Sequence, residues 1–146
     1  METVFYFPIL QKGVYYVMAE NKPKIKIELE YPVNCSRRIL FERLSSTAGL
    51  SEWFADDVKL MGDVYDFIWD KQSHPAQLIA IKDLKQVRFR WNESPADHYF
   101  EFRLVSEELS GSISLVVTDF VTEHEKAEAI HLWDTLIADL KRIIGT

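Results

Sequence analysis

Two adjacent acids, Asp56 and Asp57, follow an aromatic pair in the stretch GLSEWFADDV and are the first candidates for chemistry. Neighbouring residues of an extended chain point to opposite faces, so these carboxylates cannot converge on one proton or one metal ion. Their spacing also lacks the alternating ligands and the later glutamate of a calcium-binding loop. We therefore expect the two acids to end a short helix and to keep the next strand edge solvated, while Trp53 and Phe54 pack in the core.

Three possible metal ligands, His124, Glu128 and His131, recur at the spacing i, i+4, i+7, which places them on one face of a helix. That face lies opposite the apolar stripe of the same helix, so the three side chains are expected to point into water. A catalytic metal needs a sheltered open position. The sequence therefore predicts no metal, no cofactor and no catalytic residue, and His74 and His98 have no evident relay partner.

Large aromatic residues are the third candidates, because they recur at every second position in several predicted strands. Rings with a few polar tips commonly line a small-molecule pocket, although large rings also simply fill protein cores. An inward indole or hydroxyl needs a hydrogen-bond partner, which a ligand can supply. Both interpretations stay open. The predicted pocket lining is Phe67, Trp69, Phe89, Trp91, Phe102, Trp133 and Ile137.

The composition indicates one globular domain. Of the 146 residues, 47% are hydrophobic and 27% are charged, and a chain of this size buries about 68% of its unfolded surface. The net charge of −6 argues against nucleic-acid binding, which needs a concentrated basic face. The single cysteine, Cys35, forms no internal disulfide and is compatible with the cytoplasm, the expected location.

The first 18 residues, METVFYFPILQKGVYYVM, are apolar and aromatic and form a separate N-terminal extension. A proline and a lysine interrupt a run that is already too short for a bilayer, so no membrane span is expected. Three alternatives remain: a secretory signal that ends near Val17-Met18-Ala19, upstream translation with Met18 as the native start, or an extra strand or arm on the sheet. Residues 24–146 are predicted to form a single domain.

Hydrophobic periodicity predicts, in order, the elements that must position these residues. Alternation in KIKIELEY predicts a half-buried strand over residues 24–31, and Ser36 and Thr47 are suitable N-caps for two short helices. Six strands separated by turn residues then follow. They are expected at residues 58–60, 64–70, 77–82, 86–92, 98–105 and 112–121, with turns at Gly62-Asp63, Ser73-His74-Pro75, Asp83, Ser94-Pro95 and Ser110-Gly111.

A long amphipathic helix is predicted at the C-terminal end. Thr122 and Glu125 match the S/T-x-x-E capping box at its start, and Gly145 is a natural stop. Only this helix is long enough to cover the apolar face of the sheet. The predicted fold class is therefore α+β, with a curved antiparallel sheet of about seven strands wrapped around the helix in a helix-grip arrangement. The apolar stripe of the helix comprises Ile130, Trp133, Leu136, Ile137, Leu140, Ile143 and Ile144.

The chain resembles the START-like domains, also called the SRPBCC superfamily, over about residues 24–146. The segments that carry the resemblance are NCSRRILFERLSS, GLSEWFADDV, GDVYDFIWD, VRFRW, HYFEFRL, SLVVTDF and LWDTLIADLKRIIG. This superfamily includes steroidogenic-acute-regulatory lipid-transfer domains, birch-pollen-allergen proteins and polyketide cyclases. The nearest branch resembles small bacterial proteins related to activators of the heat-shock-protein-ninety ATPase.

The resemblance implies a cavity between the sheet and the terminal helix that takes a hydrophobic or amphipathic small molecule, such as a lipid. It favours a non-enzymatic, cytoplasmic binding protein. One alternative is a protein-interaction module that regulates a chaperone through its surface, where exposed aromatic residues such as Tyr99 would be relevant. Another alternative is a cyclase- or hydrolase-type enzyme, which needs an inward ionisable group with a perturbed pKa.

Overall fold

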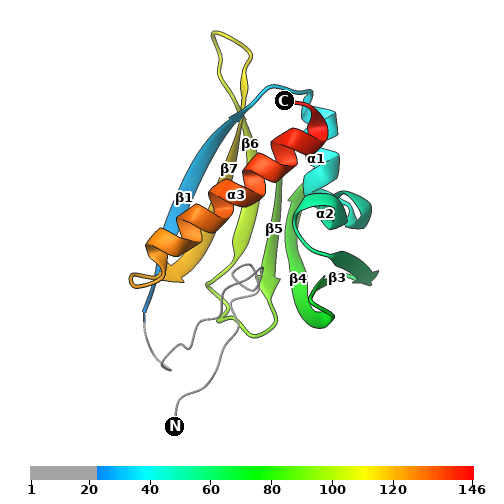
Figure 1. Cartoon of the computed structure of the whole chain (residues 1–146), viewed down its shortest axis with the longest axis vertical. Helices are drawn as coiled ribbons and strands as arrows, with labels where there is room; N and C mark the ends of the chain where they lie inside the picture. The colour runs from blue at the N-terminus through cyan, green and yellow to red at the C-terminus, as the bar shows by residue number, and fades with distance from the viewer. Residues whose placement is uncertain (1–22) are drawn as a thin grey trace.

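The computed structural model describes residues 23–146, in which one antiparallel sheet holds a long helix against its concave face (Figure 1). The expectations for residues 1–18 lie outside the described residues. Within residues 23–146, no helix is long and apolar enough to cross a membrane. The elements are β1 (Lys24–Val33), α1 (Arg37–Ser45), α2 (Thr47–Trp53), β2 (Asp57–Met61), β3 (Val64–Trp69), β4 (Gln72–Lys82), β5 (Gln86–Trp91), β6 (Phe100–Ser106), β7 (Ile113–Thr122) and α3 (Lys126–Ile144).

The strand order is β1-β7-β6-β5-β4-β3-β2, so the first and last strands lie side by side. Their register runs from Lys24 opposite Thr122 to Val33 opposite Ile113. Short connections join the other neighbours, which are all antiparallel. The helix α3 crosses the sheet diagonally from the β1–β7 side to α1 and α2 (Figure 1). The predicted α+β class, with two short helices after the first strand, is confirmed.

The two short helices begin at serine caps. Ser36 Oγ accepts a hydrogen bond from the backbone N–H of Ile39 at 3.2 Å, which confirms the predicted cap of α1. The predicted Thr47 cap of α2 is wrong, because Ser46 caps this helix by accepting from Gly49 N–H at 2.9 Å. Ser46 has the extended backbone of a cap, and this places Thr47 inside the helix.

The turn between β3 and β4 lies earlier than predicted. The expected turn at Ser73-His74-Pro75 is wrong, because Asp70 and Lys71 take positive φ angles of 50° and 65° and form a two-residue hairpin turn. Pro75 is tolerated in a central strand because its backbone nitrogen, which has no hydrogen to donate, points toward β5 just beyond the last residue of that strand. Its carbonyl accepts a hydrogen bond from Asn92 N–H at 3.0 Å.

The start of α3 also differs in detail. Glu125 Oε1 accepts hydrogen bonds from Thr122 N–H at 3.2 Å and from Thr122 Oγ1 at 2.7 Å, as the capping box predicts. These bonds close a turn that precedes the helix, which begins at Lys126 with Glu125 in the N-cap position. Thr122 is therefore not the cap. At the other end, Gly145 adopts a left-handed conformation with a φ of 82°, which confirms the predicted stop.

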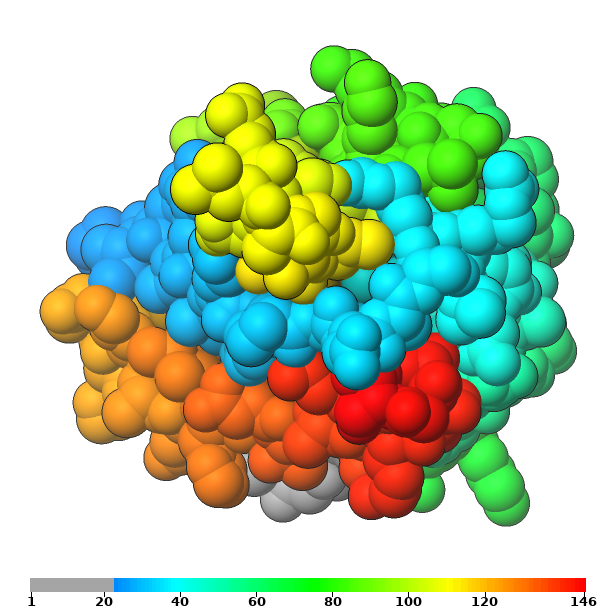
Figure 2. Space-filling model, turned by 90° about the horizontal axis from the view of Figure 1, so that it is seen from above, coloured from blue at the N-terminus to red at the C-terminus, as the bar shows by residue number. Residues whose placement is uncertain are grey.

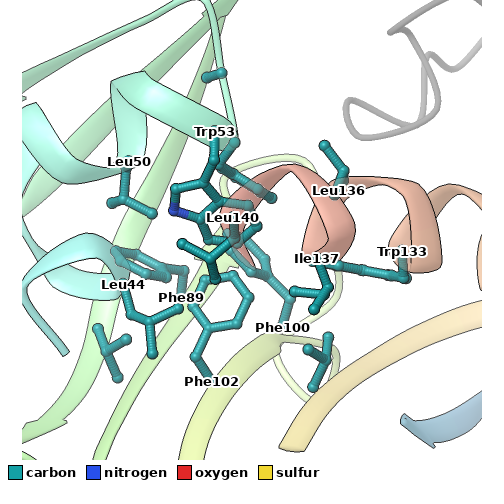
Figure 3. Packing of buried hydrophobic residues seen from close by; sticks show 14 of the residues in the cluster. Leu44, Leu50, Trp53, Phe89, Phe100, Phe102, Trp133, Leu136, Ile137 and Leu140 are labelled. Carbon is teal, nitrogen blue, oxygen red and sulfur yellow. The ribbon is translucent and has the colours of Figure 1, made fainter. Parts of the chain in front are cut away.

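The apolar stripe of α3 is buried where it meets the sheet. Trp133, Leu136, Ile137 and Leu140 are at most 1% exposed, and Figure 3 shows Trp133 and Ile137 directed toward Phe100. In the last turn the prediction is wrong for Ile143, which is 37% exposed, whereas Ile144 is partly buried and packs against the core. The fully buried part of the stripe lies in the central turns of α3.

Gly49 fixes how closely α1 and α2 approach each other. A Cβ atom at this position would lie 2.5 Å from the Glu42 carbonyl oxygen and 2.6 Å from Arg43 Cα, and both are backbone atoms. This close contact sets the path of α2, which leads directly to Trp53 and Phe54 in the core.

We expect Gly49→Ala to lower the free energy of unfolding by about 1–3 kcal/mol because the added methyl group overpacks this contact. Alanine favours helices intrinsically, so unchanged or increased stability would contradict the close contact. Chemical denaturation measures the effect. Ala48→Ser, at an exposed position of the same helix, is the control and should have little effect.

Candidate functional site

The concave face of the sheet carries a cluster of aromatic rings, because alternate residues of each strand point inward. All seven predicted pocket residues lie in or beside this cluster and are 0–7% exposed. Six of them are rings of the cluster, and Ile137 lies one turn after Trp133 on α3. The aromatic cluster comprises Phe54, Tyr65, Phe67, Trp69, Phe89, Trp91, Phe100, Phe102 and Trp133.

Phe54, which follows α2, fills the middle of the space between sheet and helix. Its ring centroid lies 5.2 Å from that of Phe67, 5.7 Å from that of Phe100 and 5.9 Å from that of Trp133. The ring is fully buried, as expected from the sequence. Because protein atoms occupy the centre, a ligand must lie to one side of Phe54 along the concave face.

One end of the concave face is covered by α1, the segment after β1 and the last turn of α3, as Figure 2 shows from above. Asn34 N–H donates to Thr146 Oγ1 at 3.0 Å, and Arg37 Nη1 donates to the Leu84 carbonyl at 2.8 Å. Two open surface hollows at this end, one beside Cys35 and one beside Leu84, lie outside the aromatic cluster. We call this the upper end, following Figure 1.

The opposite, lower end of the concave face carries Trp69, His74 and Trp91. His74 lies opposite Phe67, and Trp91 lies opposite Ala76, which is fully buried two residues after His74 on the same face. The ring centroid of Trp69 is 5.7 Å from that of His74 and 6.0 Å from that of Trp91. The sheet thus brings an imidazole and two indoles together at this end.

The polar atoms of these rings differ in their hydrogen bonding. Trp69 Nε1–H donates to the Phe54 carbonyl at 2.9 Å, and Trp53 Nε1–H donates to the Arg43 carbonyl at 2.8 Å. By contrast, Trp91 Nε1 and His74 Nε2 are buried without a hydrogen-bond partner among residues 23–146. Buried polar groups normally have partners, so each exception needs an explanation.

The imidazole of His74 is held neutral by its surroundings. Burial lowers the pKa of His74 below its ordinary value, and the negative charges of Glu93 and Asp66 oppose this shift. A neutral imidazole has one nitrogen that accepts a hydrogen bond and one that donates. His74 can therefore accept a hydrogen bond from a hydroxyl group at this end.

An inward acid, Asp119, was missed by the sequence analysis. It lies on β7, is 3% exposed, and accepts hydrogen bonds from Trp133 Nε1–H at 3.0 Å and Phe120 N–H at 2.8 Å. Alternation in SLVVTDFVT was the available signal, because it places Asp119 on the same face as Leu115 and Val117. Both carboxylate oxygens are taken by donors of the protein, so Asp119 primarily anchors α3 to the sheet.

Asp119 titrates close to neutrality. The pKa of Asp119 is raised from 3.8 to about 7, chiefly by burial and in smaller part by the nearby Glu125 charge, against the lowering effect of the hydrogen bonds from Trp133 and Phe120 and of the Lys24 charge. Glu125 is itself 2% exposed, and its Oε2 atom has no hydrogen-bond partner among the described residues. Asp119 on β7 and Glu125 at the N-cap of α3 are therefore two buried carboxyl groups that act on each other.

The remaining polar candidates have other roles. Asp56 Oδ2 accepts from Asp70 N–H at 2.8 Å and so holds the β3–β4 turn, whereas Asp57 Oδ1 accepts from Val58 N–H at 2.9 Å. His124, Glu128 and His131 are exposed. Among the residues that the structure describes, no three potential ligands lie close enough to hold a metal ion.

The expectation that Tyr99 is exposed is wrong. Its ring is half-buried on the convex face, where the Arg88 guanidinium carbon lies 3.9 Å from the ring centroid. Arg88 also forms an ion pair with Glu101 at 2.9 Å. A cation that covers the aromatic face leaves little of this ring available to a partner protein.

The family model for the START-like superfamily domain matches residues 18–146. A Bacteroides fragilis protein solved in solution, BfR322, is 36% identical, with 83% of this chain and 91% of that chain covered and a TM-score of 0.61. The Aha1 dimer structure from Colwellia psychrerythraea is 16% identical, with 82% and 96% covered and a TM-score of 0.68. A comparison with curated proteins found no match.

We expect Asp119 to make stability fall as pH rises from about 4 to 7. In this window the folded protein keeps a proton that the unfolded chain has released, so the limiting slope is about 1.4 kcal/mol per pH unit. Above pH 7 the contribution is lost and the curve levels. Denaturation of the wild-type protein and of Asp119→Asn at pH 5, 6, 7 and 8 measures the difference.

The comparison isolates Asp119 because all other groups titrate in both proteins. Asp57→Asn, at an exposed strand edge, is the control and should keep the wild-type slope. Parallel pH curves for the wild-type protein and Asp119→Asn would show that Asp119 has no raised pKa.

Proposed function

The chain belongs to the START-like superfamily, and on this basis we propose that it binds an apolar or amphipathic small molecule between the sheet and α3, without catalysing a reaction on it. The proposed site is the lower end of the concave face, beside Trp69 and Trp91. Folds of this kind host many functions. The specific support for this proposal therefore comes from the residues of the site.

The observation that carries the proposal is the partnerless indole of Trp91. Its side chain is 7% exposed, and its Nε1 atom is buried and has no hydrogen-bond partner among the described residues. The other three tryptophans donate to atoms of the protein itself. A buried donor without a partner costs about 1–3 kcal/mol, and a ligand oxygen at this position removes that cost.

The rings around Trp91 would provide most of the binding free energy. Phe67 and Phe100 lie with ring centroids 5.4 Å and 4.7 Å from that of Trp91. Burial of apolar surface contributes about 25 cal/mol per Å² before the cost of ordering the ligand. About 330 Å² of buried apolar surface corresponds to about 8 kcal/mol, the free energy of micromolar binding, before that cost is subtracted.

The chaperone-regulating alternative has no separate support in this structure. The likeness to the Aha1 dimer, at 16% identity, supports the fold alone. Tyr99, the aromatic residue expected to mark a protein-binding surface, is covered by Arg88. A chaperone partner stays a prediction from the resemblance, and a pull-down from native lysate tests it directly.

We expect at least one member of a panel of palmitate, cholesterol and naphthalene to change the tryptophan emission of the protein saturably, with a dissociation constant in the micromolar range. Trp69 and Trp91 report on the proposed site because their indoles line it. Trp91→Phe should reduce the emission change. If no panel member binds, the proposed function is wrong.

Ala76→Leu distinguishes a ligand site from a fully packed core. Ala76 is fully buried opposite Trp91, so the added carbons enter the proposed site. We expect ligand affinity to fall at least tenfold with less than about 1 kcal/mol change in the free energy of unfolding, because space for a ligand accommodates a leucine.

A packed core gives the opposite result for Ala76→Leu. Overpacking would then lower stability by about 1–3 kcal/mol, and no ligand binding would exist to lose. Ala80→Leu adds the same volume on the same strand opposite Arg88 and serves as the matched control. It should leave ligand affinity unchanged.

A further inference from the structure

The lower end of the concave face contains two partnerless nitrogens rather than one. Trp91 Nε1 and His74 Nε2 are both buried, and neither has a hydrogen-bond partner in the part of the chain that the structure describes. Trp91 pairs with Ala76 across β4 and β5, and His74 precedes Ala76 by two residues on the same face. Diagonal neighbours of this kind lie about 7–8 Å apart at their Cα atoms, within reach of one small group held between long side chains.

The chemistry of the two nitrogens is complementary. An indole N–H only donates, so it needs an oxygen or another acceptor. A neutral imidazole can offer an acceptor nitrogen. A hydroxyl group satisfies both atoms together, because its oxygen accepts from Trp91 and its hydrogen is donated to His74. An ether or ketone oxygen satisfies Trp91 alone.

The charges near this pair disfavour an anion. Asp66 and Glu93 act on His74 with negative charge, and a ligand carboxylate here would be repelled and would lose its hydration. A ligand ammonium group would be attracted by the same charges, but it has no acceptor atom and so leaves the Trp91 N–H without a partner. A neutral polar group is the one that fits the surroundings.

We propose that the ligand carries a neutral hydroxyl group, held between Trp91 Nε1–H and His74 Nε2, on a flat apolar skeleton that lies against the rings of the aromatic cluster. The ligand class is thus an aromatic alcohol or phenol rather than a fatty acid. This inference rests on the proposed function and specifies the polar group that the same site selects.

Four matched naphthalene probes test the inference. Naphthalene has no polar group, 2-methoxynaphthalene has only an acceptor oxygen, 2-naphthol has a neutral hydroxyl, and 2-naphthoate is an anion of similar shape. Calorimetric titration gives each affinity. We expect 2-naphthol to bind about tenfold more tightly than naphthalene, with 2-methoxynaphthalene between them and 2-naphthoate weakest.

Substitutions assign the preference to the two nitrogens. Trp91→Phe keeps a ring but removes the N–H, so 2-naphthol and naphthalene should bind equally. His74→Phe removes the acceptor, so 2-naphthol should bind no better than 2-methoxynaphthalene. Trp53→Phe is the control: Trp53 lies outside the proposed site and its N–H already donates to the Arg43 carbonyl, so the preference for 2-naphthol should remain.

A spectroscopic readout keeps the test independent of how well these variants fold. In the wild-type protein, the indole N–H signal of Trp91 should shift downfield with 2-naphthol and much less with naphthalene, in a nitrogen–proton correlation spectrum. A shift confined to another tryptophan would overturn the assigned site.

The outcomes separate the inference from the proposed function. Equal binding of naphthalene and 2-naphthol, or tightest binding of 2-naphthoate, would overturn the hydroxyl preference while the binding function stands. If none of the four probes binds but palmitate or cholesterol does, the inference likewise fails alone. If nothing in either set binds, both are wrong.

Discussion

The contact between the apolar stripe of α3 and the concave face of the sheet is the constraint on which the rest of the structure depends. Trp133 is central to it, because its ring packs against Phe54 and Phe102 while its indole donates to Asp119 on β7. Apolar burial gives the contact its free energy. The hydrogen bond from Trp133 to the buried Asp119 fixes the position of α3 along the sheet and makes the stability of this contact depend on pH.

This contact also decides where a ligand can lie. The Phe54 ring packs between Trp133 of α3 and the rings of the strands, so protein rings fill the centre between the sheet and the helix. The upper end is closed by α1 and the end of α3. At the lower end, Trp91 Nε1 and His74 Nε2 have no hydrogen-bond partner among the described residues. The proposed ligand would therefore be selected by its shape and by one polar group rather than by charge.

The convex face is organised by different forces. Glu101 is 3% exposed and forms ion pairs with Arg88 and Arg103, and Arg103 also reaches Glu28 on β1. These ion pairs link β5, β6 and β1 across the convex face and pass over β7, which lies between β6 and β1. The alternation of residue types along each strand separates this charged face from the aromatic face. Solved structures of 12–20% identity share the fold.

The sequence by itself determined the element order, the inward faces of the strands and the central stripe of α3, because these follow from periods of two and 3.6 residues. It also identified the rings that gather on the concave face. The Ser46 cap, the β3–β4 turn and the inward Asp119 were placed wrongly or missed. Only the tertiary structure decided which indoles find an acceptor within the protein. Trp53 donates to Arg43, Trp69 to Phe54 and Trp133 to Asp119. Trp91 Nε1 and His74 Nε2 have no partner among the described residues. The physical reason is that hydrogen-bond satisfaction depends on which atoms meet in space, and residues 10–15 positions apart supply those partners.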